Sequence, residues 1–252
     1  FIDLRSGEYG VYVKNLKTNE YFEINEHPMF SASIIKLFIM SAVYDKINNG
    51  ELEYTPEIKD TVRIMIEESD NDAANELVTI LGNGDIDAGF EIENKISADM
   101  GFVNTKQQTD LQDVRTHPAK GRNYASPADS GRLLEMIYNK QFYSESISND
   151  AMDFLKNQQS VYKIPAGLPE GVAAANKTGE MTGVENDAAI VFTDNCDYIL
   201  CIMGNDIGDE GYGVDTIVQL SEMVYEYMSS YAVPTPEPTP VPAYMNLNKN
   251  GF

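Results

Sequence analysis

The 252-residue chain has few basic residues, few cysteines and few histidines. Its 18 Lys and Arg residues stand against 40 Asp and Glu, which gives a formal net charge of -22 at pH 7. This charge would repel a nucleic acid or an anionic membrane surface, so neither is expected as a partner. No run of about 18 apolar residues occurs, and no membrane-spanning helix is therefore predicted.

The two cysteines and two histidines give no basis for a disulfide or a metal site. Cys196 and Cys201 are five positions apart in a predicted strand, too far for an unstrained bridge, so both are expected to be free thiols. His27 and His117 lie far apart, without a cluster of cysteines or carboxylates at metal-ligand spacing. A Ser-His-Asp esterase would also need a GxSxG motif, which the chain lacks. We expect no metal and no cofactor.

The most apolar stretch of the chain, SASIIKLFIM at residues 31–40, carries one charged residue, Lys36. Apolar residues surround it on nearly all sides of a predicted helix, and lysine is rarely buried without a partner. Ser33 lies three positions earlier, on the same helical face and at the predicted helix start. A buried lysine loses proton affinity, and its neutral form can accept a proton from a hydroxyl. Ser33 is therefore a candidate nucleophile, although a serine at a helix start is usually a simple cap.

Hydrophobic periodicity predicts strands near both ends of the chain and helices between them. Residues 9–25 alternate between apolar and polar around a turn signal at 17–19, which predicts a hairpin. The buried helix is expected to end near residues 48–50. Further helices are predicted from about 61, with a break at 69–71, and then to about 100. Others are predicted from 126 and around 149–158. Strands are predicted over 172–181, 182–192 and 198–207, and a closing helix over 213–230. This order indicates an α+β fold.

Three segments interrupt the regular pattern. At the first break, Ser69 and Asp72 have the spacing of a capping box, which would explain both residues without any function. Residues 101–126 lack periodicity, and a loop of that length inside a compact domain more often has a function than not. Residues 233–242, VPTPEPTPVP, favour an extended polyproline conformation and resemble the stalks of exported surface proteins.

Three short motifs follow one another along the chain: Ser33-Ile34-Ile35-Lys36, Ser69-Asp70-Asn71 and Lys177-Thr178-Gly179. In this order they resemble the signature set of the penicillin-recognising serine enzymes, which are the class A beta-lactamases and penicillin-binding proteins. The resemblance covers almost the whole domain and implies a five-stranded antiparallel sheet flanked by helices, with an inserted all-helical lobe. It also implies a catalytic domain over 1–232, with a sheet lobe of about 1–30 and 165–232, a helical lobe of about 31–164, and a Pro/Thr-rich tail over 233–252.

The resemblance implies roles for four side chains in acyl transfer. Ser33 would attack a carbonyl carbon while Lys36 receives its proton, directly or through a water. Ser69 would pass a proton towards the leaving nitrogen, and Lys177 would add positive charge beside it. The backbone N–H groups of Ser33 and Glu180 would form the oxyanion hole.

The same motifs imply the substrate-binding residues Asn71, Thr178, Gly179 and Glu180. Asn71 would hold a substrate amide together with the Lys36 side chain, and Thr178 would hydrogen-bond the substrate carboxylate. The partner implied is a small molecule, either a beta-lactam or a D-alanyl peptide, and contact with peptidoglycan is expected on the second alternative.

The chain departs from class A beta-lactamases in the loop that follows the second motif. Those enzymes carry a glutamate there, which activates the water that hydrolyses the acyl-enzyme, whereas this chain has no Glu between Glu93 and Glu135. Asp110 and Asp113 lie in the corresponding region with shorter side chains, and we expect both to be solvated loop charges. Slow deacylation is therefore predicted.

A second departure concerns the charge available to a substrate carboxylate. Many class A enzymes use an arginine on the strand after the third motif, whereas this chain has no cationic side chain between Lys177 and Lys249. Glu180 adds a negative charge beside the cleft. Carboxylate binding would therefore depend on Lys177 and Thr178.

Three functions are compatible with these residues. The first is a serine hydrolase of the class A beta-lactamase type, and the second is a D-alanyl-D-alanine carboxypeptidase on the same scaffold. The third is a non-catalytic surface module that binds peptidoglycan or a beta-lactam, although the retained lysines argue against it. The chain begins at Phe1 without a signal peptide, so we expect that a leader was removed from an exported protein that is extracellular or attached to the cell surface.

Overall fold

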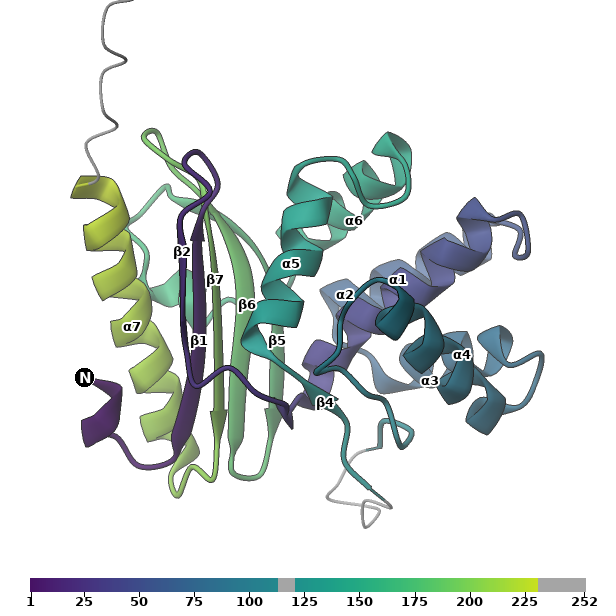
Figure 1. Cartoon of the computed structure of the whole chain (residues 1–252), viewed down its shortest axis with the longest axis horizontal. Coiled ribbons are helices and arrows are strands. Elements are labelled where there is room, and N and C mark those ends of the chain that lie inside the picture. Colours follow the sequence, from purple (N-terminus) through teal and green to yellow (C-terminus); the bar gives the residue numbers. More distant parts are fainter. Residues whose placement is uncertain (113–120, 231–252) are drawn as a thin grey trace, which may run out of the picture.

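A five-stranded antiparallel sheet runs through the structure, a computed structural model that describes residues 1–112 and 121–230. Its strands lie side by side in the order β2 (Tyr21–Ile24), β1 (Glu8–Asn15), β7 (Tyr198–Asn205), β6 (Val184–Phe192) and β5 (Ala173–Met181). The N-terminal hairpin therefore completes a sheet whose other three strands come from the end of the domain (Figure 1). The predicted α+β class and the five-stranded antiparallel sheet are confirmed.

The N-terminal hairpin forms where the alternating pattern predicted it. Val11 of β1 pairs with Ile24 of β2, and the Asn15 side chain holds the turn by accepting backbone hydrogen bonds at 2.9 and 3.0 Å. Asn19 has a φ of 63°, a left-handed conformation that asparagine tolerates well. Strand β1 is nevertheless buried along most of its length, because helices cover both faces of the sheet.

Helices lie on both sides of the sheet (Figure 1). Helix α7 (Glu210–Ser230) and the short η3 (Ile164–Gly167) pack on one face, over a cluster of buried residues from β1, β6 and β7. The larger core lies on the other side, between the sheet and the remaining helices. These are α1 (Ile35–Asn48), α2 (Pro56–Glu67), α3 (Asn71–Leu81), α4 (Ile86–Asp99), α5 (Pro127–Tyr138) and α6 (Glu145–Lys156).

Helix α1 is the centre of the larger core. Its first ten residues, from Ile35 to Tyr44, are all buried, including Lys36. An apolar surface on every side is what a helix needs when other elements surround it completely. The prediction of a buried helix that ends near residues 48–50 is therefore confirmed.

The structure corrects three predicted element boundaries. Ser33 lies in the 3-10 turn η2 (Ala32–Ile34), which continues directly into α1, rather than in the α-helix itself. Helix α6 begins at Glu145, before the predicted 149, and α7 begins at Glu210, before the predicted 213. The α6 start follows a local signal, since the Ser144 side chain accepts a hydrogen bond from the Ile147 N–H.

The long irregular segment after α4 contains little regular structure. The two-residue strand β4 (Tyr124–Ala125) pairs with β3 (Met29–Phe30), just before η2. Residues 113–120 of this segment, and the predicted tail at 233–252, lie outside the described residues. The division into a sheet lobe and a helical lobe at the boundaries given above stays a prediction.

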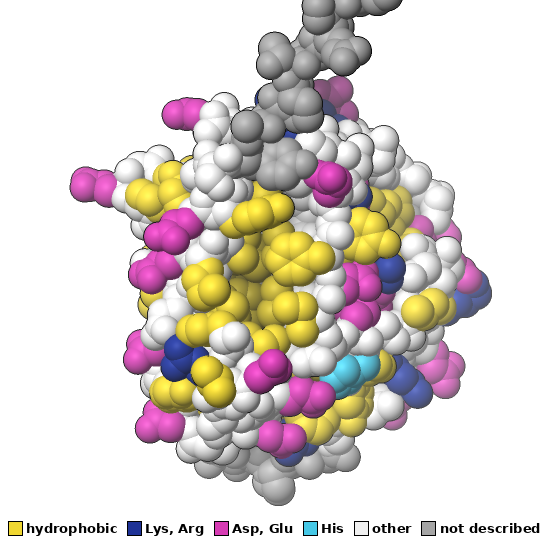
Figure 2. All heavy atoms as spheres, turned by 60° about the vertical axis from the view of Figure 1, so that its left-hand side comes forward, with side chains coloured by type: hydrophobic (Ala, Val, Ile, Leu, Met, Phe, Trp, Pro, Cys, Tyr) yellow, Lys and Arg dark blue, Asp and Glu magenta, His cyan; other side chains and the backbone are white. Residues whose placement is uncertain are grey.

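Two further observations concern the surface and the thiols. Figure 2 shows the face bordered by α7 and β2, where apolar side chains gather in the centre and acidic side chains surround them. Exposed apolar residues of these two elements include Tyr21 and Phe22 on β2 and Met223 on α7. Cys196 and Cys201 are buried free thiols, as predicted. Among the described helices, none combines the length and apolar content that a membrane crossing requires.

Candidate active site

Lys36 is wholly buried at the first turn of α1, and its ammonium group contacts oxygen atoms of Ser33, Ser69 and Asn71. Its Nζ lies 2.9 Å from Ser33 Oγ, 2.8 Å from Asn71 Oδ1, and 2.6 and 3.3 Å from the carbonyl and hydroxyl oxygens of Ser69. No described carboxylate pairs with it. Burial therefore lowers the pKa of Lys36 to about 7, although the charges of Asp70 and Glu180 oppose this shift.

Ser33 is presented to Lys36 by a strained and tightly held turn. The preceding residue, Ala32, has a φ of 42°, which costs on the order of 1 kcal/mol or more for a residue other than glycine. The buried Asn186 of β6 donates hydrogen bonds from Nδ2 to the carbonyls of Phe30 and Ser31, at 2.9 and 3.0 Å. These bonds tie the chain before Ser33 to the sheet and keep Ser33 at a fixed position.

The Ser69-Asp70-Asn71 motif is the connection between α2 and α3. Asp70 is the N-cap of α3, because its side chain accepts a hydrogen bond of 2.7 Å from the Ala73 N–H. The predicted capping box led by Ser69 is therefore wrong. Ser69 instead has a φ of 58°, and its carbonyl and hydroxyl oxygens both contact the Lys36 Nζ. The cap at Asp70 leaves the Ser69 side chain available for chemistry.

Lys177, on β5, approaches Ser69 from the sheet. It is wholly buried, and its Nζ donates to Ser69 Oγ at 2.7 Å and to the Thr178 carbonyl at 2.8 Å. Burial lowers the pKa of Lys177 well below its ordinary value, and the nearby charge of Lys36 lowers it further. The Ser69 hydroxyl thus lies between two buried amines with reduced proton affinity, and all four predicted catalytic side chains form one connected cluster.

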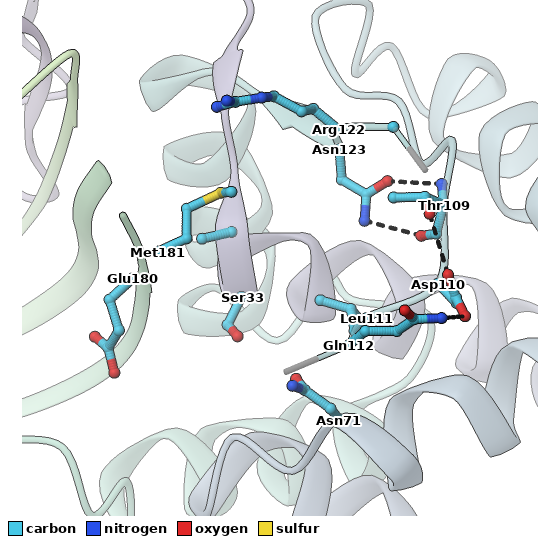
Figure 3. Close-up of a pocket in the computed structure, with 12 residues that line it drawn as sticks. Ser33, Asn71, Thr109, Asp110, Leu111, Gln112, Arg122, Asn123, Glu180 and Met181 are labelled. Atoms are coloured by element: carbon cyan, nitrogen blue, oxygen red, sulfur yellow. Dashed lines mark hydrogen bonds between the residues drawn. The ribbon is translucent and has the colours of Figure 1, made fainter. Parts of the chain in front are cut away.

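Gly179 allows β5 to lie directly against the turn that carries Ser33. A Cβ atom at Gly179 would come within 2.7 Å of the Ser31 carbonyl oxygen and 3.0 Å of the Ser33 amide nitrogen. No side chain fits at this distance without moving the strand. Glu180 is thereby placed next to Ser33, and both residues line one cleft with Asn71 (Figure 3). Thr178 Oγ1 is buried and has no hydrogen-bond partner among the described residues.

Lys163 is a buried residue of the site that the sequence reasoning missed. Its Nζ lies 2.7 Å from Glu180 Oε2 and 2.7 Å from Glu185 Oε2, and it reaches the carbonyls of Gly179 and Asn186 at 3.4 and 3.2 Å. Burial opposes the ionisation of Glu180, but the Lys163 charge and its hydrogen bond hold the pKa of Glu180 below its usual value. No motif marks Lys163, since its partners come from the β5–β6 hairpin.

Two polar residues of β6 were also missed, although the sequence carried a signal for them. Asn186 and Asp187 stand beside the otherwise apolar run AAIV, and buried polar residues in such a strand need specific partners. Asp187 accepts hydrogen bonds from the Ile164 N–H at 2.9 Å and from Asn176 Nδ2 at 3.0 Å. Burial raises the pKa of Asp187 to about 6. These contacts anchor the segment that carries Lys163.

The loop after α4 forms the wall of the cleft opposite β5. Asp110 lines the cleft, is partly buried and accepts hydrogen bonds from the Thr109 hydroxyl and the Gln112 amide (Figure 3). Asp110 thus remains partly exposed, as expected of a loop charge, while neighbouring side chains also hydrogen-bond its carboxylate. Asn123 holds the loop by exchanging hydrogen bonds with the backbone of Thr109 at 3.0 Å each way. Asp113 lies outside the described residues.

The comparisons with known proteins concern the family and the fold. A model of the beta-lactamase enzyme family matches residues 1–59 and 53–228. Similar solved structures include PBP-A, with 24% identity over 90% of this chain and 91% of that chain and a TM-score of 0.79. A PBP-A variant in an acyl-enzyme complex with penicillin G has 23% identity, coverage of 91% and 93%, and a TM-score of 0.80. A beta-lactamase from Sphaerobacter thermophilus has 21% identity, coverage of 90% and 94%, and a TM-score of 0.76. These structures establish the fold, and no curated protein matches.

Proposed function

Because the chain belongs to the beta-lactamase enzyme family, we propose that it is a serine hydrolase which beta-lactam amides acylate at Ser33 and which releases the acyl group slowly. The observation that carries this proposal is the 2.9 Å contact between Ser33 Oγ and a wholly buried Lys36 Nζ. An amine in this environment is neutral in a large fraction of molecules near pH 7, and it can then act as a general base.

Acylation would proceed by one bond exchange at the substrate carbonyl. Ser33 Oγ attacks the carbonyl carbon, and its proton passes to the Lys36 Nζ. When the carbon–nitrogen bond breaks, the leaving nitrogen receives a proton through the Ser69 hydroxyl, which contacts both Lys36 and Lys177. The product is an ester between the acyl group and Ser33, and the proton taken from Ser33 is returned to the leaving group.

The negative charge that develops on the carbonyl oxygen needs hydrogen-bond donors that are already in place. The backbone N–H groups of Ser33 and Glu180 would supply them, and the close approach of Gly179 to the Ser33 amide supports this role. Each such donor commonly contributes about 3 kcal/mol to transition-state stabilisation. The donors belong to two different elements, so their distance depends on the contact between β5 and η2.

Slow release of the acyl group follows from the residues opposite Ser33. The chain has no Glu between Glu93 and Glu135, and the Asp110 carboxylate is occupied by Thr109 and Gln112. This loop favours a second candidate within the same proposal, a D-alanyl-D-alanine carboxypeptidase that acts on cell-wall peptides and that penicillin would acylate. An extracellular or cell-surface location, with contact to peptidoglycan, fits that substrate and the stalk-like sequence at 233–242.

Intact-protein mass spectrometry over time tests the proposal, after the protein is mixed with a penicillin and separately with a chromogenic cephalosporin. We expect a mass increase of one drug molecule that persists for many minutes. Rapid drug loss without a lasting adduct would instead indicate an efficient beta-lactamase. The absence of both would favour the non-catalytic binding module.

The control variant is Ser33→Ala. It removes one partly exposed hydroxyl, so we expect the adduct to disappear while the midpoint of thermal unfolding stays within a few degrees of the wild type. An adduct that persists in this variant would remove Ser33 as the nucleophile.

A further inference from the structure

Arg122 carries the only cationic side chain among the described residues that line the cleft. Figure 3 shows it at the opposite end of the cleft from Asn71. Arg122 is exposed, and its guanidinium has no carboxylate partner within the described part of the chain. Acidic residues outnumber basic ones by 40 to 18 in this protein, so a cation without a carboxylate is unusual here. Its N–H groups are available to an anion that enters the cleft.

An aromatic platform beside the Ser33 turn holds the guanidinium. Phe30 of β3 pairs with Tyr124 of β4, and the centres of their rings are 5.3 Å apart. The Arg122 guanidinium lies 4.0 Å from the centre of the Phe30 ring. Stacking uses the flat face of a guanidinium and leaves its N–H edges free for a carboxylate. Phe30 precedes Ser33 by three residues, which span at most about 11 Å, so Arg122 has a defined place near Ser33.

The groups around Ser33 determine which part of a substrate would lie toward Arg122. In the proposed acylation, the leaving nitrogen lies beside the Ser69 hydroxyl, and the carbonyl oxygen faces the N–H groups of Ser33 and Glu180. The remaining substituent of the carbonyl carbon is the acyl chain, which must extend away from Ser69. The cleft beside Ser33 is lined by residues 109–112 and by Arg122, and Ser69 is not among its described lining residues. The acyl chain would therefore enter this cleft.

Two carboxylates also line the cleft, and both have other partners. Asp110 accepts hydrogen bonds within its own loop, and Glu180 pairs with the buried Lys163 at 2.7 Å. Figure 3 shows Asp110 in the wall opposite Met181, and the Glu180 carboxylate points away from Arg122. Neither carboxylate occupies the guanidinium, so Arg122 can pair with an anionic group of a ligand.

We propose that Arg122 is a specificity-determining residue which binds a carboxylate on the acyl chain of the substrate. This inference rests on the proposed acylation of Ser33 and adds a preference for acyl donors with an anionic acyl chain. Donors with an uncharged acyl chain, such as benzylpenicillin, still react but more slowly. The two parallel N–H groups of an arginine match the geometry of a carboxylate. The pair would form at the exposed end of the cleft, so it affects the choice between substrates and not the chemistry at Ser33.

The test compares two penicillins that differ by one charge on the acyl chain. The first is 6-aminopenicillanic acid acylated with adipic acid, whose free carboxylate ends a flexible chain, and the second is the methyl ester of that carboxyl group. Both keep the carboxylate on the ring. In Arg122→Gln, the acid-to-ester ratio of second-order acylation rates should fall about 5-fold, which is the effect of a favourable exposed ion pair. Arg122→Lys should retain part of the ratio, because it keeps the charge without the paired N–H groups.

Lys17→Gln is the matched control, because it removes an equal charge from an exposed position in the turn between β1 and β2, at the edge of the sheet far from β5. It should leave the ratio at the wild-type value. About 0.5 M salt should lower the wild-type ratio toward that of Arg122→Gln, because salt screens exposed charges.

Two results would overturn this inference and leave the proposed function intact. One is a fall of both rates by the same factor in Arg122→Gln, which would mean that Arg122 only supports Phe30. The other is an acid-to-ester ratio that is the same in Arg122→Gln and the wild type. Failure of the wild type to react with either compound or with benzylpenicillin would overturn the proposed function, and this inference with it.

Discussion

Two buried clusters around the cleft each contain lysine, yet they place it in opposite surroundings. Lys36 and Lys177 contact hydroxyl, amide and carbonyl oxygens, and among the described residues neither has a carboxylate as a hydrogen-bond partner. Lys163 is equally buried but lies 2.7 Å from each of two carboxylates, Glu180 and Glu185. The three side chains all have an accessibility of 0%.

The difference shows that burial alone does not make a lysine reactive. A carboxylate compensates a buried ammonium group for the lost water, whereas neutral dipoles compensate it only in part, and burial lowers the pKa of both Lys36 and Lys177. Lys36 therefore suits proton transfer, whereas Lys163 suits the support of β5 and of the segment before η3. The two clusters meet at Glu180, which contacts Lys163 directly and acts on Lys36 at longer range.

Replacement of Lys36 by methionine should give the largest effect on activity. Methionine retains most of the side-chain volume but cannot accept a proton, so the acylation rate should fall by about 10³-fold or more. Because the replaced amine is costly to bury, the free energy of unfolding at pH 7 should not fall by more than about 1 kcal/mol. Stopped-flow acylation and urea unfolding measure the two quantities. An unchanged acylation rate would contradict the assignment of Lys36 as the base.

Lys163→Met should lower the stability of the protein more than Lys36→Met does, and the acylation rate less. It leaves the buried Glu185 and the half-buried Glu180 without their cation, and removal of one partner from a buried ion pair typically costs about 3 kcal/mol. We expect that loss in urea unfolding, together with a smaller fall in acylation than in Lys36→Met. The double variant Lys163→Met with Glu185→Gln should recover part of the stability, because it removes one of the stranded charges. Equal destabilisation by Lys36→Met and Lys163→Met would contradict the difference drawn between the two clusters.

The pH dependence of acylation and of stability tests the surroundings of Lys36, and the expected change in acylation is smaller than that caused by Lys36→Met. Burial lowers the pKa of Lys36 to about 7, and only the neutral amine accepts the Ser33 proton, so acylation should rise about 10-fold between pH 6 and 8 and then level off. The folded pKa lies below the ordinary value of 10.5, so between these values the unfolded chain binds more protons. The wild type should therefore gain stability relative to Lys36→Met as the pH rises from 7 to 10. A difference that stays constant across that range would contradict a lowered Lys36 pKa.

Much of the candidate catalytic cluster could be predicted from the sequence because its residues belong to short, local patterns. Lys36 stands out within an apolar helix, and the motifs that contain Ser69 and Lys177 lie at the break between two helices and within a strand. The hairpin at 9–25 was equally local, since its alternation and its turn are adjacent in the chain. All eight predicted site residues lie in or beside the one cleft or its buried cluster.

The main omission involves contacts between distant parts of the chain. The role of Lys163 depends on its ion pairs with Glu180 and Glu185, which lie 17 and 22 positions later in the chain. The hydrogen bonds of the Asp110 carboxylate were also missed, although their donors, Thr109 and Gln112, lie only one and two positions away. The capping box predicted at Ser69 was wrong by one position, because Asp70 is the N-cap and accepts from the Ala73 N–H.

The sequence by itself determined the helix that must be buried, the candidate nucleophile Ser33 and candidate base Lys36 at its start, and the order of the motifs, because periodicity and spacing act over a few residues. Only the tertiary structure decided which buried lysine meets hydroxyl oxygens and which meets carboxylates. That choice sets which amine can accept a proton. It depends on the packing of β5 against η2 and of the segment before η3 beneath β5, and no local pattern encodes those long-range contacts.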